Sequence, residues 1–174
     1  MSSMAYTKAM PELPEVETVR IGLSRLIIGK TFAAVDFDTS KSFPNAAPDV
    51  VSFLVGARVV AVQRRAKVLL IELSSKYSLV IHLKMTGQLV FRSAHEQFGA
   101  GHPNGSLVGP LPDKSTRTVL DFSDGSKLFF NDQRKFGWVR LIPTAEVINL
   151  DFFKRVGPEP LSNDFTWQLL KGRL

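Results

Sequence analysis

The residues best suited to covalent chemistry in this 174-residue chain are Met10-Pro11-Glu12. Removal of the methionine would leave Pro11 as a chain-terminal secondary amine beside the Glu12 carboxylate. Such an amine can attack an electrophilic sugar carbon and form an iminium, while the carboxylate shuttles protons. On these residues alone a structural role is the alternative, because Pro11 and Pro14 also suit the entrance to a helix.

The helix that would position this pair is predicted at about 14–28. Glu15 and Glu17 place negative charge at the positive end of the helix dipole. Apolar residues recur at helical spacing on one face, and Gly29 is a natural stop. The apolar face consists of Val16, Val19, Leu23, Leu26 and Ile27.

The segments after this helix are short, rich in Val, Ile, Leu and Phe, and separated by turn signals. A helix is expected at 49–55 and a hairpin turn at 123–126. Short strands at this spacing indicate a mostly β (α+β) fold, an antiparallel two-sheet β-sandwich or flattened barrel with flanking helices. The predicted strands are 32–38, 58–64, 68–73, 79–83, 88–91, 118–122, 127–130 and 138–142.

The chain is expected to have three parts. Residues 1–9 are small and polar, and we interpret them as an extension or a cloning remnant. Residues 10–156 are predicted to form the β-sandwich domain, with a short helix within 144–156 that Thr144 caps. Residues 157–174 are predicted to be a linker followed by the start of another helix.

The segment 93–114 is predicted to be one long loop, because it is polar and rich in Gly and Pro. Its two histidines, His95 and His102, have no carboxylate cluster beside them, so we assign no metal site. His82 lies in an apolar strand and is interpreted as a core or rim residue.

Composition limits the classes of protein to consider. The formal charge of +6 favours a polyanionic partner. The absence of cysteine excludes a disulfide framework and a thiolate zinc site in this chain. We find no apolar run of membrane-spanning length and no signal peptide, so a cytoplasmic protein is expected, associated with the nucleoid if it is bacterial.

Four separate stretches resemble the motifs of one known family. They are Pro11–Thr18, Val62–Lys67, Asn131–Gly137 and Gly157–Ser162. In type and order they are similar to the formamidopyrimidine-DNA glycosylase / endonuclease VIII family, and the formamidopyrimidine branch fits best. The resemblance implies a β-sandwich catalytic domain, with 157–174 as the linker and first helix of a truncated helix–two-turns–helix domain.

The activity that this resemblance implies is DNA glycosylase with AP lyase activity, acting on oxidised or ring-opened purines in base-excision repair. Pro11 would attack C1′ of the damaged nucleotide, Glu12 would donate or relay a proton, and Lys67 would assist β-elimination. On the residues alone, Lys67 is a surface lysine in a hairpin. No cofactor is expected in this chain, since the family's structural zinc belongs to a missing zinc finger.

The partner that the resemblance implies is damaged double-stranded DNA, bound by a monomer without a nucleotide cofactor. Taking a base out of the stack costs a few kcal/mol. By resemblance, Met85, Arg134 and Phe136 would fill the gap left by the extruded nucleotide, and an arginine can read the orphaned base. On the residues alone, Met85 and Phe136 would be packing residues.

Phosphate contacts are implied for Lys114, Arg117 and Lys135, and they would give salt-dependent affinity without base specificity. The chain also departs from the family pattern. Lys135 replaces an arginine and loses its bidentate fork, Ser115 replaces a DNA-binding histidine, and Lys84 stands where a glycine is common.

The rival hypothesis is a non-catalytic damaged-DNA-binding module or an inert fragment. If residues 1–9 remain attached, the nitrogen of Pro11 is an ordinary amide and no nucleophile. The absence of the second domain also favours this alternative, because the family grips DNA between its two domains.

Overall fold

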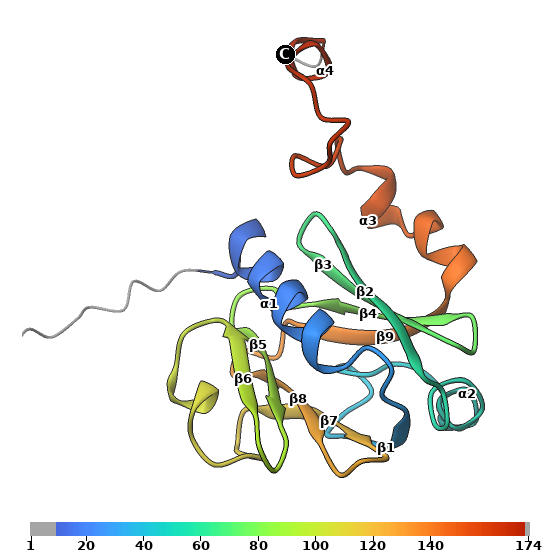
Figure 1. Ribbon diagram of the computed structural model, residues 1–174, viewed down its shortest axis with the longest axis vertical. Coiled ribbons are helices and arrows are strands. Elements are labelled where there is room, and N and C mark those ends of the chain that lie inside the picture. Colours follow the sequence, from blue (N-terminus) through green and yellow to red (C-terminus); the bar gives the residue numbers. More distant parts are fainter. Residues whose placement is uncertain (1–9, 173–174) are drawn as a thin grey trace, which may run out of the picture.

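The computed structural model describes residues 10–172, so the predicted extension at 1–9 lies outside the described residues. Within them, nine strands form two antiparallel sheets (Figure 1). The strands are β1 (Phe32–Phe37), β2 (Val59–Arg65), β3 (Val68–Leu73), β4 (Tyr77–His82), β5 (Gly87–Arg92), β6 (Gln97–Gly101), β7 (Thr116–Phe122), β8 (Lys127–Asp132) and β9 (Trp138–Pro143).

The larger sheet has the strand order β1-β7-β8-β5-β6, and the smaller has the order β2-β3-β4-β9. The strand pairings within residues 10–172 are all antiparallel, and the main hydrophobic core joins side chains from both sheets. Fully buried members include Leu69, Ile71, Leu79 and Ile81 from the smaller sheet and Leu89, Leu120, Leu128 and Phe130 from the larger. The predicted two-sheet fold class is confirmed.

The N-terminal helix α1 (Leu13–Leu26) packs on the edge strands of both sheets, β2 and β6, and so covers one side of the sandwich (Figure 1). Its predicted apolar face is buried, with Val16, Val19 and Leu23 almost inaccessible to solvent. Gly22 faces the ring of Phe98 in β6, where a Cβ atom would come within 2.1 Å of the ring. The glycine therefore allows the close approach of helix and sheet.

Strand β6 lies inside the segment 93–114, which was predicted to be a loop, so that prediction is wrong. The segment also contains the 3₁₀ helix η1 (Gly105–Leu107). Among the described residues, strand β6 pairs only with β5, at the edge of the larger sheet. Its glycines, Gly99 and Gly101, conceal the apolar alternation that marks the other strands.

The segment 144–156 forms two short helices in place of one, η2 (Thr144–Asn149) and α3 (Asp151–Lys154). Thr144 does not cap a helix, because its hydroxyl is hydrogen-bonded to the hydroxyl of Ser78 at 2.8 Å. This segment packs on the outer face of the smaller sheet, where Phe153 and Val147 form a second small core with residues of β3 and β4.

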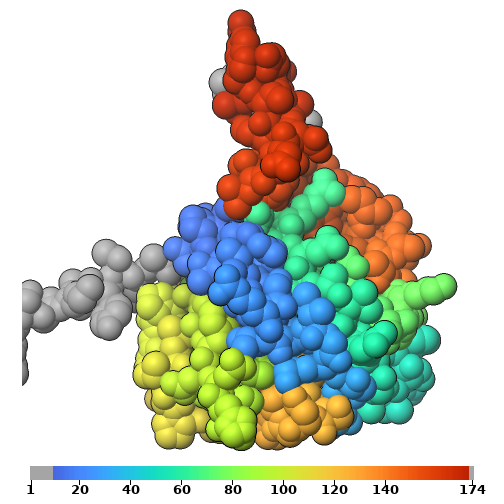
Figure 2. All heavy atoms as spheres, in the orientation of Figure 1, coloured from blue at the N-terminus to red at the C-terminus, as the bar shows by residue number. Residues whose placement is uncertain are grey.

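The remaining helices are α2 (Ala47–Phe53), close to its predicted position, and α4 (Trp167–Lys171). The side chain of Thr166 accepts a hydrogen bond from the N–H of Leu169 and caps α4. No side chain of α4 is buried. The chain that carries α4 projects from the sandwich (Figure 2).

Candidate functional site

Strand register brings three separate segments to one end of the smaller sheet. Val68 in β3 pairs with His82 in β4, and His82 pairs with Trp138 in β9. The chain just before Val68, just after His82 and just before Trp138 therefore lies at the same end. These segments are the tip of the β2–β3 hairpin and two connections between the sheets.

The two connections, which we call the crossover loops, span 83–86 between β4 and β5 and 133–137 between β8 and β9. Gly87 and Asp132, which adjoin them, are paired in the larger sheet. Both loops therefore lie next to each other, and each connects one sheet to the other. They carry four of the residues predicted to bind DNA, namely Met85, Arg134, Lys135 and Phe136.

Lys67, at the tip of the β2–β3 hairpin, reaches the start of α1. Its Nζ lies 2.5 Å from Oε2 of Glu12, and the two side chains are 41% and 50% exposed. Pro11 directly precedes Glu12 and is buried. The structure therefore brings together the three residues that were predicted to be catalytic, from segments more than fifty positions apart.

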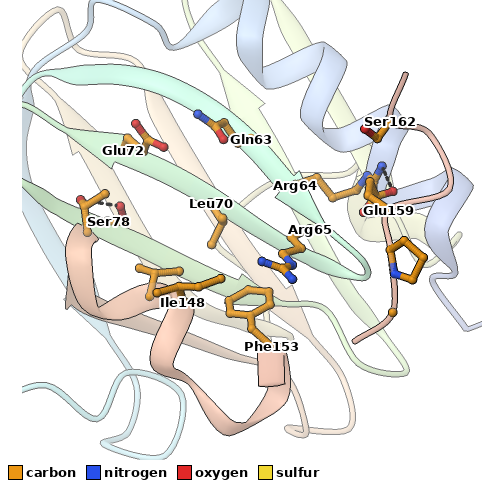
Figure 3. A pocket seen from close by; sticks show the side chains of 14 residues that line it. Gln63, Arg64, Arg65, Leu70, Glu72, Ser78, Ile148, Phe153, Glu159 and Ser162 are labelled. Carbon is orange, nitrogen blue, oxygen red and sulfur yellow. Dashed lines mark hydrogen bonds and ion pairs between the residues drawn. The ribbon is translucent and has the colours of Figure 1, made fainter. Parts of the chain in front are cut away.

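A buried guanidinium fixes this hairpin to its surroundings. Arg64 donates through Nε to Glu17 in α1 and through Nη2 to Glu159, both at 2.8 Å. Figure 3 shows the contact with Glu159. The second oxygen of Glu159 accepts the N–H of Ala66 at 3.0 Å. Burial alone would raise the pKa of Glu159, but the hydrogen bonds from Arg64 and Ala66 outweigh it and lower that pKa.

This ion-pair network joins α1, the hairpin and the linker, and the sequence interpretation missed it. Glu159 lies within the motif stretch Gly157–Ser162, and this motif was the sequence feature that could have revealed the network.

Beside the network is a hollow of about 530 Å³ between the smaller sheet and the segment 144–162 (Figure 3). None of the predicted site residues lines it.

Asp132 holds the two crossover loops together, and it is fully buried. Its carboxylate accepts hydrogen bonds from the hydroxyl of Thr86 and from the N–H groups of Arg134 (3.1 Å) and Gly137 (2.6 Å). Thr86 in turn accepts the N–H of Arg134 at 3.0 Å. One buried carboxylate therefore fixes the conformation of both loops.

The exposed surface of the crossover loops combines an aromatic ring with positive charge. Phe136 is 47% exposed, and the guanidinium of Arg134 lies 5.1 Å from the centre of its ring. Lys135 is exposed and Met85 is half-buried. An exposed ring beside a cation is suited to stacking on a nucleic-acid base.

Two lysines in these loops have a left-handed backbone. The φ angle is +52° at Lys84 and +58° at Lys135. Left-handed φ values are unfavourable for residues other than glycine. This explains why the resemblance leads one to expect glycine at position 84.

Arg117 has different surroundings from those predicted. It is 8% exposed, and it donates hydrogen bonds to the carbonyl of Asp132 (2.8 Å), the carboxylate of Asp38 (2.6 Å) and the carbonyl of Lys114 (2.6 Å). Its guanidinium therefore connects three segments inside the protein and is not presented to a phosphate. Lys114 is exposed, whereas Ser115 is buried.

His82 is buried at the end of β4, in agreement with its interpretation as a core or rim residue. Burial, followed by the positive charges of Lys84 and Lys67, lowers its pKa from 6.5 to about 4. Its Nδ1 accepts the N–H of Lys84 at 3.1 Å. The folded protein therefore holds a neutral imidazole at neutral pH.

Replacement of His82 by asparagine should reduce the loss of stability in acid. Between about pH 6.5 and about pH 4 the unfolded chain protonates His82 and the folded chain does not, so the free energy of unfolding falls as the pH falls. The wild type should lose about 2–3 kcal/mol more than His82→Asn between about pH 7.5 and about pH 4.5, measured by urea denaturation. The control variant His95→Asn, which changes an exposed histidine, should lose as much stability as the wild type over this pH range. Equal losses in wild type and His82→Asn would contradict the prediction.

Residues 10–172 contain neither a metal-binding cluster nor a membrane-spanning helix. No group of three or more His, Asp or Glu side chains there is arranged to hold a metal ion. No helix in that range is both long enough and apolar enough to cross a membrane.

Comparison with known proteins gives consistent matches. Residues 10–139 match the model of the formamidopyrimidine-DNA glycosylase N-terminal domain. The formamidopyrimidine-DNA glycosylase of Pediococcus pentosaceus is 36% identical over 165 residues, which cover 95% of this chain and 55% of that protein. The enzyme of Paracoccus denitrificans is 40% identical over 161 residues, covering 92% and 54%.

Solved structures agree with these matches. The Lactococcus lactis formamidopyrimidine-DNA glycosylase bound non-covalently to DNA with an AP site is 28% identical, with a TM-score of 0.75 over 93% of this chain and 56% of that chain. The same enzyme in complex with Fapy-dG-containing DNA gives a TM-score of 0.75, covering 93% of this chain and 56% of that chain. The chain spans about half the length of the curated relatives it matches. It belongs to the formamidopyrimidine-DNA glycosylase family.

Proposed function

We propose that this chain carries the nucleophile and the lesion-facing loops of a DNA glycosylase with AP lyase activity in base-excision repair. The observation that supports this most is the 2.5 Å contact between Lys67 and Glu12, directly beside Pro11. An amine nucleophile, a carboxylate and an ammonium group within reach of one another are the groups that this chemistry requires.

In the proposed reaction, the free nitrogen of Pro11 attacks C1′ of the damaged nucleotide. The bond from C1′ to the base breaks, and its electron pair leaves on the base, which takes a proton that Glu12 donates or relays. Opening of the sugar ring then gives an iminium between Pro11 and C1′. Loss of a proton from C2′ expels the phosphate at C3′, and Lys67 assists by donating a proton to the leaving oxygen.

The crossover loops would stabilise the opened DNA. Phe136 and Met85 would occupy the gap left by the extruded nucleotide, and Arg134 would face the orphaned base. Contacts of this kind offset part of the unstacking cost, which is a few kcal/mol. Lys114 and Lys135, both exposed, would bind phosphates. For Arg117 we propose a positioning role, because its donors bind three segments of the protein itself.

The substrates that we propose are oxidised and ring-opened purines in double-stranded DNA. The Lactococcus lactis relative was crystallised with Fapy-dG-containing DNA and with abasic-site DNA, which supports this choice. We propose that the reaction consumes no cofactor, that the protein acts as a monomer, and that it works in the cytoplasm.

The 174-residue chain should bind DNA weakly and with a steep dependence on salt. The measurement is a fluorescence titration of a duplex that contains a tetrahydrofuran abasic-site analogue, between about 50 and about 200 mM salt. The variant Lys135→Gln should reduce the log–log salt slope by about 0.9, since it removes one phosphate contact. The charge-matched control is Lys76→Gln. Lys76 lies between β3 and β4, at the opposite end of β3 from Lys67.

Failure to bind the duplex at the lowest salt concentration would contradict the proposed DNA partner. An equal fall in slope for Lys135→Gln and Lys76→Gln would mean that net charge, and not the crossover loop, determines binding.

A further inference from the structure

The segment 38–43, which we call the Lys41 loop, follows β1 and has a fixed conformation. Phe43 is fully buried, and its ring stacks on that of Phe37 with 5.3 Å between the ring centres. The hydroxyl of buried Ser42 donates to the carboxylate of Asp38 at 2.8 Å. The side chain of Lys41 is exposed and extends from this anchored loop.

The Lys41 loop is attached to the chain that follows the second crossover loop. The N–H of Val139 donates to the carbonyl of Ser42 at 2.8 Å. Val139 lies three residues after Phe136, so this hydrogen bond brings Lys41 beside the exposed ring. The Nζ of Lys41 is 5.9 Å from the centre of the Phe136 ring.

The charge of Lys41 is available for a ligand. Within residues 10–172, no carboxylate lies within ion-pair distance of its ammonium group, whereas several other lysines are paired in this way. Phe136 consequently has Arg134 within 5.1 Å and Lys41 within 5.9 Å. A polyanion that receives the ring between its bases would bring phosphates close to Lys41.

We propose that Lys41 binds a phosphate of the DNA backbone next to the point where Phe136 enters the duplex. This inference rests on the proposed function, and it adds to the site a residue outside all four motif stretches. Lysine suits the role because its ammonium is a flexible point charge that binds phosphate without demanding bidentate geometry.

The test uses the complete chain and the duplex with the tetrahydrofuran abasic-site analogue. Lys41→Gln should reduce the log–log salt slope by about 0.9, so that a fourfold rise in salt weakens binding about 3.5-fold less than in the wild type. Lys41→Arg should keep the wild-type slope, because it keeps the charge. Lys76→Gln, which removes one positive charge elsewhere, should also keep it.

A wild-type slope in Lys41→Gln would overturn the inference, even if affinity fell, because Lys41 would then act only by orienting Phe136. Equal reductions in Lys41→Gln and Lys76→Gln would also overturn it, since general charge would explain both. With either of these two results, the proposed function stands as long as the wild type binds the duplex.

Absence of binding by the wild type itself would overturn the proposed function and this inference together. Thermal melting of each variant checks that an effect on binding does not arise from unfolding.

Discussion

A chain that begins at Pro11 should become covalently attached to abasic DNA when borohydride is present, and the 174-residue chain should not. Borohydride reduces an iminium to a stable amine, so it records whether the nitrogen of Pro11 has reached C1′. In the longer chain this nitrogen is part of the Met10–Pro11 peptide bond, and its lone pair is delocalised into the carbonyl. The expected result is a trapped complex on a denaturing gel for the short chain alone.

The matched variant is Pro11→Gly in the same short chain, which should abolish trapping because the secondary amine and its fixed ring are lost. Comparable trapping by the 174-residue chain would mean that another amine, such as a lysine, is the nucleophile. No trapping by any form, together with normal DNA binding, would favour the non-catalytic DNA-binding alternative.

Replacement of Asp132 by alanine should lower the free energy of unfolding by about 3 kcal/mol or more. The change leaves the hydroxyl of Thr86 and the N–H of Gly137 without their buried acceptor, and each unsatisfied donor costs about 1–3 kcal/mol. The N–H of Arg134 keeps only its second acceptor, the hydroxyl of Thr86. Urea denaturation at neutral pH measures the effect.

Two controls separate this effect from a simple loss of charge. Asp164→Ala removes an exposed carboxylate and should change stability by no more than about 0.5 kcal/mol. Thr86→Val combined with Asp132→Ala should cost less than the two single changes added together, because they break the same hydrogen bond. A loss for Asp132→Ala that is no larger than that for Asp164→Ala would contradict the anchoring role.

The fold was largely predictable from the sequence because most strands have continuous or alternating apolar residues bounded by turns. The predicted apolar face of the first helix is buried, and the predicted strands on either side of Lys67 form a hairpin. Strand β6 was missed since Gly99 and Gly101 interrupt its apolar pattern. Glycine provides no side chain from which periodicity can be recognised.

The candidate site was predictable only in part. Motifs identified Pro11, Glu12 and Lys67, but the contact between the last two depends on the register of strands that the sequence does not specify. The internal role of Arg117 was not predictable, because an arginine next to a lysine-containing turn has the same appearance whether its guanidinium is buried or exposed. Lys41 was missed for a similar reason, as its position depends on one backbone hydrogen bond from Val139.

The buried carboxylate of Asp132 also affects how DNA binding would be divided between enthalpy and entropy. Ordering one backbone residue costs about 1–2 kcal/mol, and the crossover loops would incur this cost for several residues if they were disordered in the free protein. Since Asp132 orders them during folding, most of that entropy is already lost before DNA arrives. The loops are therefore preorganised, and in the proposed complex the binding energy of Phe136 and Arg134 would remain available to hold the duplex open.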